Sequence, residues 1–126
     1  MRREYRIATL PEPISHFTDA VRAGDLLFIS GLLGVDGEGA LVATDVCAQA
    51  RQVFANMRAV LDGAGCRFDD VVKVTVYLTD VDDRPKINPL RQEVFGSARP
   101  ASTLVEVSRL AIPGAKVEID AVALIP

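Results

Sequence analysis

The sequence reads RPASTLVEV over residues 99–107 and, after an intervening segment, VEIDAVA over residues 117–123. In both stretches, side chains of different character alternate with a period of two, which is typical of β-strands with two unlike faces. Pro113-Gly114 lies between them and is a strong turn signal. The end of the chain is therefore predicted to form two strands joined by a turn.

Two further strands are expected upstream. The clearest covers residues 72–78, where aliphatic residues alternate with Lys73, Thr75 and Tyr77. A short apolar run over residues 26–30 lies between turn signals and predicts another strand. Residues 34–39, which contain three glycines, are predicted to form the loop or hairpin tip that follows it.

Two amphipathic helices are also predicted. Apolar residues recur at helical spacing from Val46 to Ala64, with Thr44 or Asp45 available as the cap and glycines at the other end. The first helix should therefore span residues 45–64. The second should begin near residues 82–85 and end near residue 96. Pro89 lacks an N–H, so either it lies in the first turn or it kinks the helix.

The order of elements favours one α+β domain over residues 1–126, with two helices on one face of a mixed six-stranded sheet. Val122 and Leu124 make the outward face of the last strand apolar, although Glu118 and Asp120 begin it polar. A neighbouring subunit would cover such a face. Alternatively, the last strand is buried centrally within its own sheet.

Composition limits the classes of function. The formal net charge is -3 and 49% of residues are hydrophobic, so the chain should fold, and its scattered Lys and Arg residues predict no nucleic-acid partner. No apolar run approaches the roughly 20 residues needed to span a membrane, and the charged N-terminus predicts a cytoplasmic protein. Cys47, Cys66 and His16 are isolated from one another, so no metal or other cofactor is expected.

The spacing of several motifs resembles the Rid family of reactive-intermediate deaminases. The residues that carry this resemblance are Ala20-Val21, residues 24–31, Gln49, Asn56, residues 70–78, residues 99–107, Leu110 and residues 117–121. The resemblance covers nearly the whole chain. It implies a homotrimer with the fold of the small trimeric chorismate mutases, in which ligand clefts lie between subunits and imines or enamines are hydrolysed to release ammonia.

The resemblance also implies a set of site residues. Glu118 takes the place of a glutamate that helps to position water, and it is the candidate acid/base. The implied substrate-binding positions are Phe17, Ser30, Gly31, Asn88, Ser102 and Leu104. From the sequence pattern alone, Glu118 is equally well explained as an exposed residue of a strand. His16 precedes Phe17 and is interpreted either as a proton-transfer group or as a structural residue.

Ser102 departs from the family pattern. In the deaminating members, an arginine at this position binds the substrate carboxylate. A guanidinium is suited to bind a carboxylate because it can donate two parallel hydrogen bonds to it. Arg99 could replace it, but it lies three residues earlier and should face the other side of the strand. The chain therefore resembles subgroups without this arginine, some of whose relatives deaminate amino-muconate-type compounds.

Three functions follow as hypotheses. The first is a hydrolase that deaminates an enamine, an imine or an amino-muconate-type compound in an intersubunit cleft. The second is a non-catalytic trimer that binds a metabolite as a regulator or acts as a chaperone. The third, an endoribonuclease or translation inhibitor, is disfavoured by the acidic charge balance.

Overall fold

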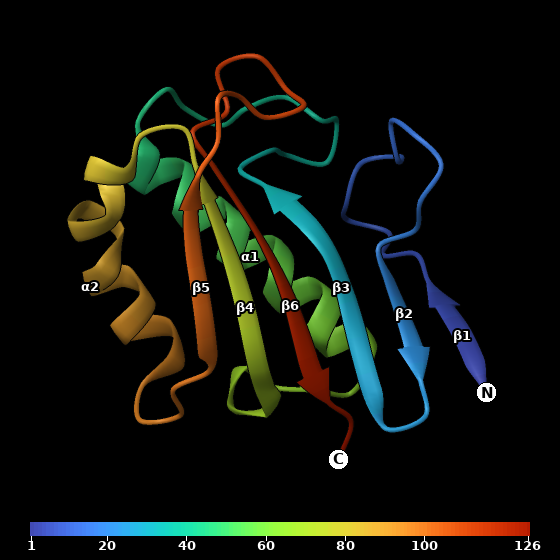
Figure 1. Cartoon of the computed structure of the whole chain (residues 1–126). Helices are drawn as coiled ribbons and strands as arrows, with labels where there is room; N and C mark the ends of the chain where they lie inside the picture. Colours follow the sequence, from blue (N-terminus) through green and yellow to red (C-terminus); the bar gives the residue numbers. More distant parts are fainter.

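A six-stranded mixed sheet carries two helices on one face (Figure 1). The computed structural model describes residues 1–126. The strands are β1 (Arg2–Tyr5), β2 (Ala20–Ala23), β3 (Leu26–Leu33), β4 (Val71–Leu78), β5 (Ala101–Glu106) and β6 (Val117–Leu124), and the helices are α1 (Val46–Gly63) and α2 (Arg84–Phe95). Their order in the sheet is β1-β2-β3-β6-β4-β5, with only the β4–β5 pair parallel. The predicted α+β architecture is confirmed.

The core lies between the sheet and α1. Along this helix the fully buried apolar residues follow the helical period, and they pack on the sheet face formed by alternate residues of β3, β4 and β6. The side chains with at most 1% exposure in these elements include Leu27, Val53, Met57, Val60, Leu61, Val74, Val76, Leu78, Val117 and Ile119. The apolar residues that recur at strand spacing and those that recur at helix spacing therefore pack against each other in one core layer.

Helix α1 begins where the sequence predicts. The Asp45 carboxylate accepts a hydrogen bond from Ala48 N at 2.9 Å, so Asp45 rather than Thr44 provides the cap. Such a cap stabilises a helix by about 1 kcal/mol. Gly65 has a φ of +74°, the left-handed conformation that suits the chain after a helix C-terminus.

Helix α2 contains Pro89 in its interior. Pro85 occupies the first turn, where an N–H would have no helical partner, whereas Pro89 removes a hydrogen bond to the carbonyl of Pro85. Packing compensates for this loss. Ile87 is fully buried, and the Phe95 ring lies edge-on to Phe54 with centroids 5.7 Å apart.

Strands β1 and β2 were not located by the sequence pattern. Each has four residues, and only Tyr5 in β1 and Ala20 in β2 are buried, so neither shows an extended alternation. They form because β2 pairs with β3 and then supplies an edge for β1. These strands depend on tertiary pairing rather than on local sequence.

The sheet face opposite the helices is open and partly apolar. β6 is central in the sheet, yet Leu124 is 48% exposed, and its neighbours Leu26 and Phe28 on β3 are 38% and 46% exposed. No element of this chain covers these side chains, and Figure 1 shows α1 behind the sheet and α2 beside its β5 edge. Of the two interpretations of the last strand, its central position is correct, but its own sheet leaves its outward face open.

Candidate functional site

A cleft of about 660 Å³ opens beside the bulged part of β3. Its lining brings together Phe17 from the loop before β2, Ser30 and Gly31 from β3, and Glu118 from β6. These four residues are among the predicted site residues. The fold therefore gathers four of the seven predicted residues in one cleft.

A β-bulge positions two of these residues. The pairing of β3 with β6 shifts between Ile29 and Leu32, so Ser30 and Gly31 lie at the irregularity. A side chain at Gly31 would collide with the carboxyl group of Glu118, since an added Cβ would be 2.8 Å from Glu118 Cδ. Glycine at this position therefore lets the carboxylate lie against the β3 backbone.

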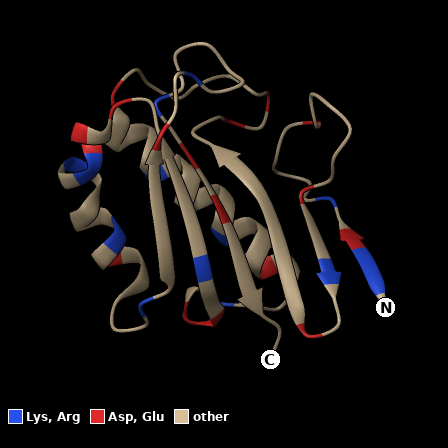
Figure 2. Ribbon diagram, in the orientation of Figure 1, with Lys and Arg blue, Asp and Glu red and all other residues tan.

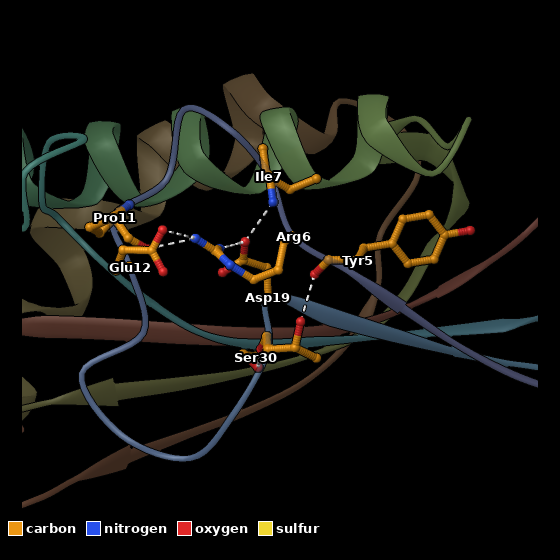
Figure 3. A network of polar contacts seen from close by, with 8 residues as sticks. Tyr5, Arg6, Ile7, Pro11, Glu12, Asp19 and Ser30 are labelled. Atoms are coloured by element: carbon orange, nitrogen blue, oxygen red, sulfur yellow. Dashed lines mark hydrogen bonds and ion pairs between the residues drawn. The ribbon is translucent and has the colours of Figure 1, made fainter.

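A polar network holds the N-terminal wall of the cleft (Figure 3). Arg6 forms an ion pair with the buried carboxylate of Asp19, which also accepts a hydrogen bond from Ile7 N at 2.7 Å. The Thr18 hydroxyl donates to Tyr5 O at 2.9 Å, and the Ser30 hydroxyl donates to Thr18 O at 2.6 Å. The hydroxyl of Ser30 is therefore engaged in fixing the loop that carries Phe17.

The surroundings of Glu118 shift the pKa of its carboxyl group. It is partly buried, and desolvation, with a smaller contribution from the negative charge of Asp120, raises its pKa above the ordinary glutamate value. Asp120 in turn accepts a hydrogen bond from the Tyr77 hydroxyl at 3.0 Å. A carboxylate with a raised pKa on a cleft wall is suited to accept and return a proton near neutral pH.

The raised pKa of Glu118 has a consequence for stability. Between the unfolded and folded pKa values the folded protein binds more protons, so this residue lowers the free energy of unfolding as pH rises through that window. Glu118→Gln should therefore stabilise the fold more at pH 7 than at about pH 4, near the pKa of an unfolded glutamate. Denaturant titrations of both proteins at the two pH values test this, and an equal difference at both would contradict it.

The other predicted site residues lie elsewhere. Asn88 is on α2, and Ser102 and Leu104 are on the edge strand β5, where they pair with Val74 and Val76 and so face the helix side of the sheet. Glu118 alternates with the buried Val117 and Ile119 and faces the opposite side. Within one chain the structure does not bring the two groups together.

Two residues discussed as alternatives, His16 and Arg99, are also placed. His16 is exposed and lines a shallow groove next to the cleft, together with Arg2 and Arg6. Arg99 is exposed just before β5 and forms no ion pair or side-chain hydrogen bond. Arg99 therefore does not occupy the position next to Ser102 in this chain.

Asn56 is a cleft residue that the sequence reasoning did not assign to the site. Its amide donates to Leu33 O and Val35 O, each at 3.0 Å, and so fixes the loop that forms the far wall. A buried asparagine within the apolar stripe of a helix was the available signal, because such a group must find backbone partners.

Comparisons with known proteins show the family of this chain. The family model described as Endoribonuclease L-PSP matches residues 7–125. Solved structures of the same fold include RidA from an Antarctic Psychrobacter, with a TM-score of 0.91, 33% identity and coverage of 98% of this chain and 99% of that one. The chain belongs to the Rid family. The predicted family is thereby confirmed.

Curated Rid-family relatives span almost the same length. A RutC family protein of Pyrococcus horikoshii is 44% identical over 114 residues, covering 90% of each chain. The human 2-iminobutanoate/2-iminopropanoate deaminase is 37% identical over 125 residues, covering 98% of this chain and 90% of the human protein. The structure contains no helix that is both long and apolar enough to cross a membrane.

Gly31→Ala tests whether the close approach of the Glu118 carboxylate to the β-bulge of this Rid protein matters for stability and activity. The new methyl group would displace the flexible end of Glu118 rather than the backbone, so the loss of stability should stay near 1 kcal/mol. The displaced carboxylate should reduce any turnover at the cleft by roughly 100-fold, since small misplacements of reacting groups are costly. Steady-state kinetics and thermal unfolding of the variant measure both effects. Unchanged kcat/KM would show that the contact has no catalytic importance.

Proposed function

We propose that this Rid protein hydrolyses a small enamine or imine to a carbonyl compound and ammonia, in clefts formed between the subunits of a trimer. The observation that carries the proposal is the desolvated carboxylate of Glu118 on the wall of a cleft that also holds Phe17, Ser30 and Gly31. The human relative is a 2-iminobutanoate/2-iminopropanoate deaminase, which supports the same class of reaction.

The proposed reaction uses Glu118 to position and activate water. The carboxylate accepts a proton from water as the water oxygen forms a bond to the imine carbon, and the imine nitrogen gains a proton. The resulting carbinolamine then loses ammonia, which leaves as the C–N bond breaks and the carbonyl forms. An enamine first gains a proton on carbon to become the imine. No redox partner is needed, because water supplies the oxygen.

Two observations support a cleft shared between subunits. Asn88, Ser102 and Leu104 lie on the opposite side and at the opposite edge of the sheet from the cleft that holds Glu118. The open apolar patch of Leu26, Phe28 and Leu124 is also suited to contact with a second copy. In a trimer, the edge strand of one subunit would complete the cleft of its neighbour.

Turnover by the purified protein tests the reaction. The protein is incubated with imines generated in situ from 2-amino acids, with the corresponding enamines and with amino-muconates, and release of ammonia is followed beyond the spontaneous rate. Faster release from at least one class supports the proposal. No acceleration with any class, together with thermal stabilisation by the carbonyl products, would instead indicate a non-catalytic binding protein.

Mixed trimers test whether the cleft is shared. Glu118→Gln removes one proposed half-site and Ser102→Trp blocks the other, so each variant alone should be inactive. If the halves come from different subunits, equal mixing of refolded chains should restore about one quarter of wild-type clefts, by random assortment around a closed ring. No recovery in mixed trimers of verified composition would place the whole site within one chain.

A further inference from the structure

The cleft that holds Glu118 has an apolar part that the proposed reaction does not use. Its side chains come from three segments: the loop before β2, the end of β3 with the loop that follows it, and the loop before β6. We call this part the apolar subsite, and it consists of Leu10, Ile14, Phe17, Leu33, Val35 and Ile112. No single segment would provide it, because the three meet only in the folded chain.

The size of the cleft exceeds what a short substrate needs. Its volume is about 660 Å³. Pockets of roughly 300–1,000 Å³ enclose ligands as large as drugs, and they are lined mainly by apolar side chains with a few polar groups. The imines in the name of the human relative carry only a methyl or an ethyl group as their apolar substituent. This cleft therefore has room for a longer group.

The apolar subsite adjoins the proposed reacting group. Leu33 on β3 is the direct cross-strand partner of Glu118 on β6, and such partners project from the same face of a sheet. Both residues also line the cleft. A substituent on the carbon that water attacks would therefore extend from Glu118 over Leu33.

The chain fixes this subsite before any ligand binds. Leu10 and Val35 are 7% and 6% exposed, and the Asn56 amide holds Val35 O at 3.0 Å. Ile14 and Phe17, in contrast, are 70% and 49% exposed. A ligand that covers these two side chains removes apolar surface from water, and the fixed backbone around them lowers the entropic cost of binding.

The charges along the cleft indicate an uncharged substituent. No Lys, Arg or His side chain lines the cleft. Glu38 and Glu118 line it without forming an ion pair, whereas Glu12 and Asp19 both pair with Arg6. A negative group placed in the subsite would lose its hydration without gaining a cation, so an anionic substituent is disfavoured.

We propose that the apolar subsite binds an uncharged apolar group larger than ethyl, so that the preferred substrates are imines or enamines with such a group rather than diacids of the amino-muconate type. This inference rests on the proposed function for its reaction. Recognition of the apolar group can nevertheless be measured by binding alone, without turnover.

Binding of straight-chain 2-oxo acids, from 2-oxobutanoate to 2-oxooctanoate, tests the proposal. These carbonyl compounds share one head group and differ only in the length of the apolar chain. In calorimetric or NMR titrations the affinity of wild type should rise about fourfold with each methylene, until the chain fills the subsite. 2-Oxoadipate, which ends in a second carboxylate, should bind at least tenfold more weakly than 2-oxohexanoate, roughly the cost of burying an unpaired charge beside carboxylates.

Two variants locate the effect in the subsite. Ile14→Ser and Ile112→Ser should each reduce the gain to less than about twofold per methylene and leave binding of 2-oxobutanoate within about twofold, because the shortest chain covers little of either residue. Val81→Ser is the matched control, since Val81 is a 43% exposed apolar residue outside the cleft lining. Thermal unfolding and oligomer mass are recorded for every variant, so that a folding defect is recognised.

The outcomes separate this inference from the proposed function. Affinity that rises with chain length and depends on Ile14, without turnover of any imine, would support the subsite and reject the hydrolase. Ammonia release with kcat/KM and affinity that do not change with chain length would overturn the subsite and leave the hydrolase intact. Tighter binding of 2-oxoadipate than of 2-oxohexanoate would show that a positive group reaches the bound chain, and would overturn the preference for an uncharged group.

Discussion

Glu118→Gln should reduce ammonia release by at least 100-fold, within the usual contribution of a positioned acid or base. Glutamine has nearly the same shape and can still hold a water molecule, but it cannot accept the proton that the attacking water must lose. The oligomer and the cleft should be unchanged, because Glu118 is only partly buried and its carboxylate forms no hydrogen bond with another side chain. Single-turnover and steady-state assays with the best substrate measure the effect.

The pH dependence of kcat/KM tests whether Glu118 itself acts as the base. Wild-type kcat/KM should fall as pH decreases through the raised pKa of Glu118, because the protonated form cannot act as a base. Asp120→Asn removes a negative charge that raises this pKa and should shift the acidic limb to lower pH. Glu93→Gln, the same substitution at an exposed position on α2, is the control and should leave the profile unchanged. An unshifted limb in Asp120→Asn would assign the limb to another group.

Gln49→Leu should produce the largest loss of stability, about 4 kcal/mol in the free energy of unfolding, because it removes three part-buried hydrogen bonds and leaves their backbone groups without these partners. Gln49 is fully buried. Its amide donates to Ala43 O at 2.9 Å and Gly114 O at 3.1 Å, and its oxygen accepts from Lys116 N at 2.8 Å. Leucine fills a similar volume but offers none of these bonds.

This residue also links stability to the site. The bonds from Gln49 fix the turn that leads into β6, two residues before Glu118. Urea unfolding at one protein concentration measures the loss. Gln52→Leu on the same helix is the matched control, because its amide bonds only the Asn56 side chain, and it should cost less than about 1 kcal/mol. Equal losses in the two variants would show that the backbone bonds of Gln49 contribute little.

Much of the fold could be predicted because its signals are local. The apolar spacing from Val46 onward located α1 to within one residue at each end, and the alternation in residues 72–78 located β4. β1 was not found, since its charged residues carry no such period and it forms only through pairing with β2. The interior position of Pro89 was also open, because packing around Phe95 rather than helix propensity decides it.

The sequence by itself determined the order of the elements from β3 to β6, the helix-facing side of the sheet and, through its resemblance, the Rid family and the candidate site residues. Only the tertiary structure decided which of these residues lie in contact with one another. Gly31 contacts Glu118 because a bulge shifts the pairing of β3 with β6, and Arg91 reaches Ser102 because α2 packs beside β5. Periodicity reports which face of its own element a residue occupies, whereas a site depends on register and packing between elements that are distant in sequence.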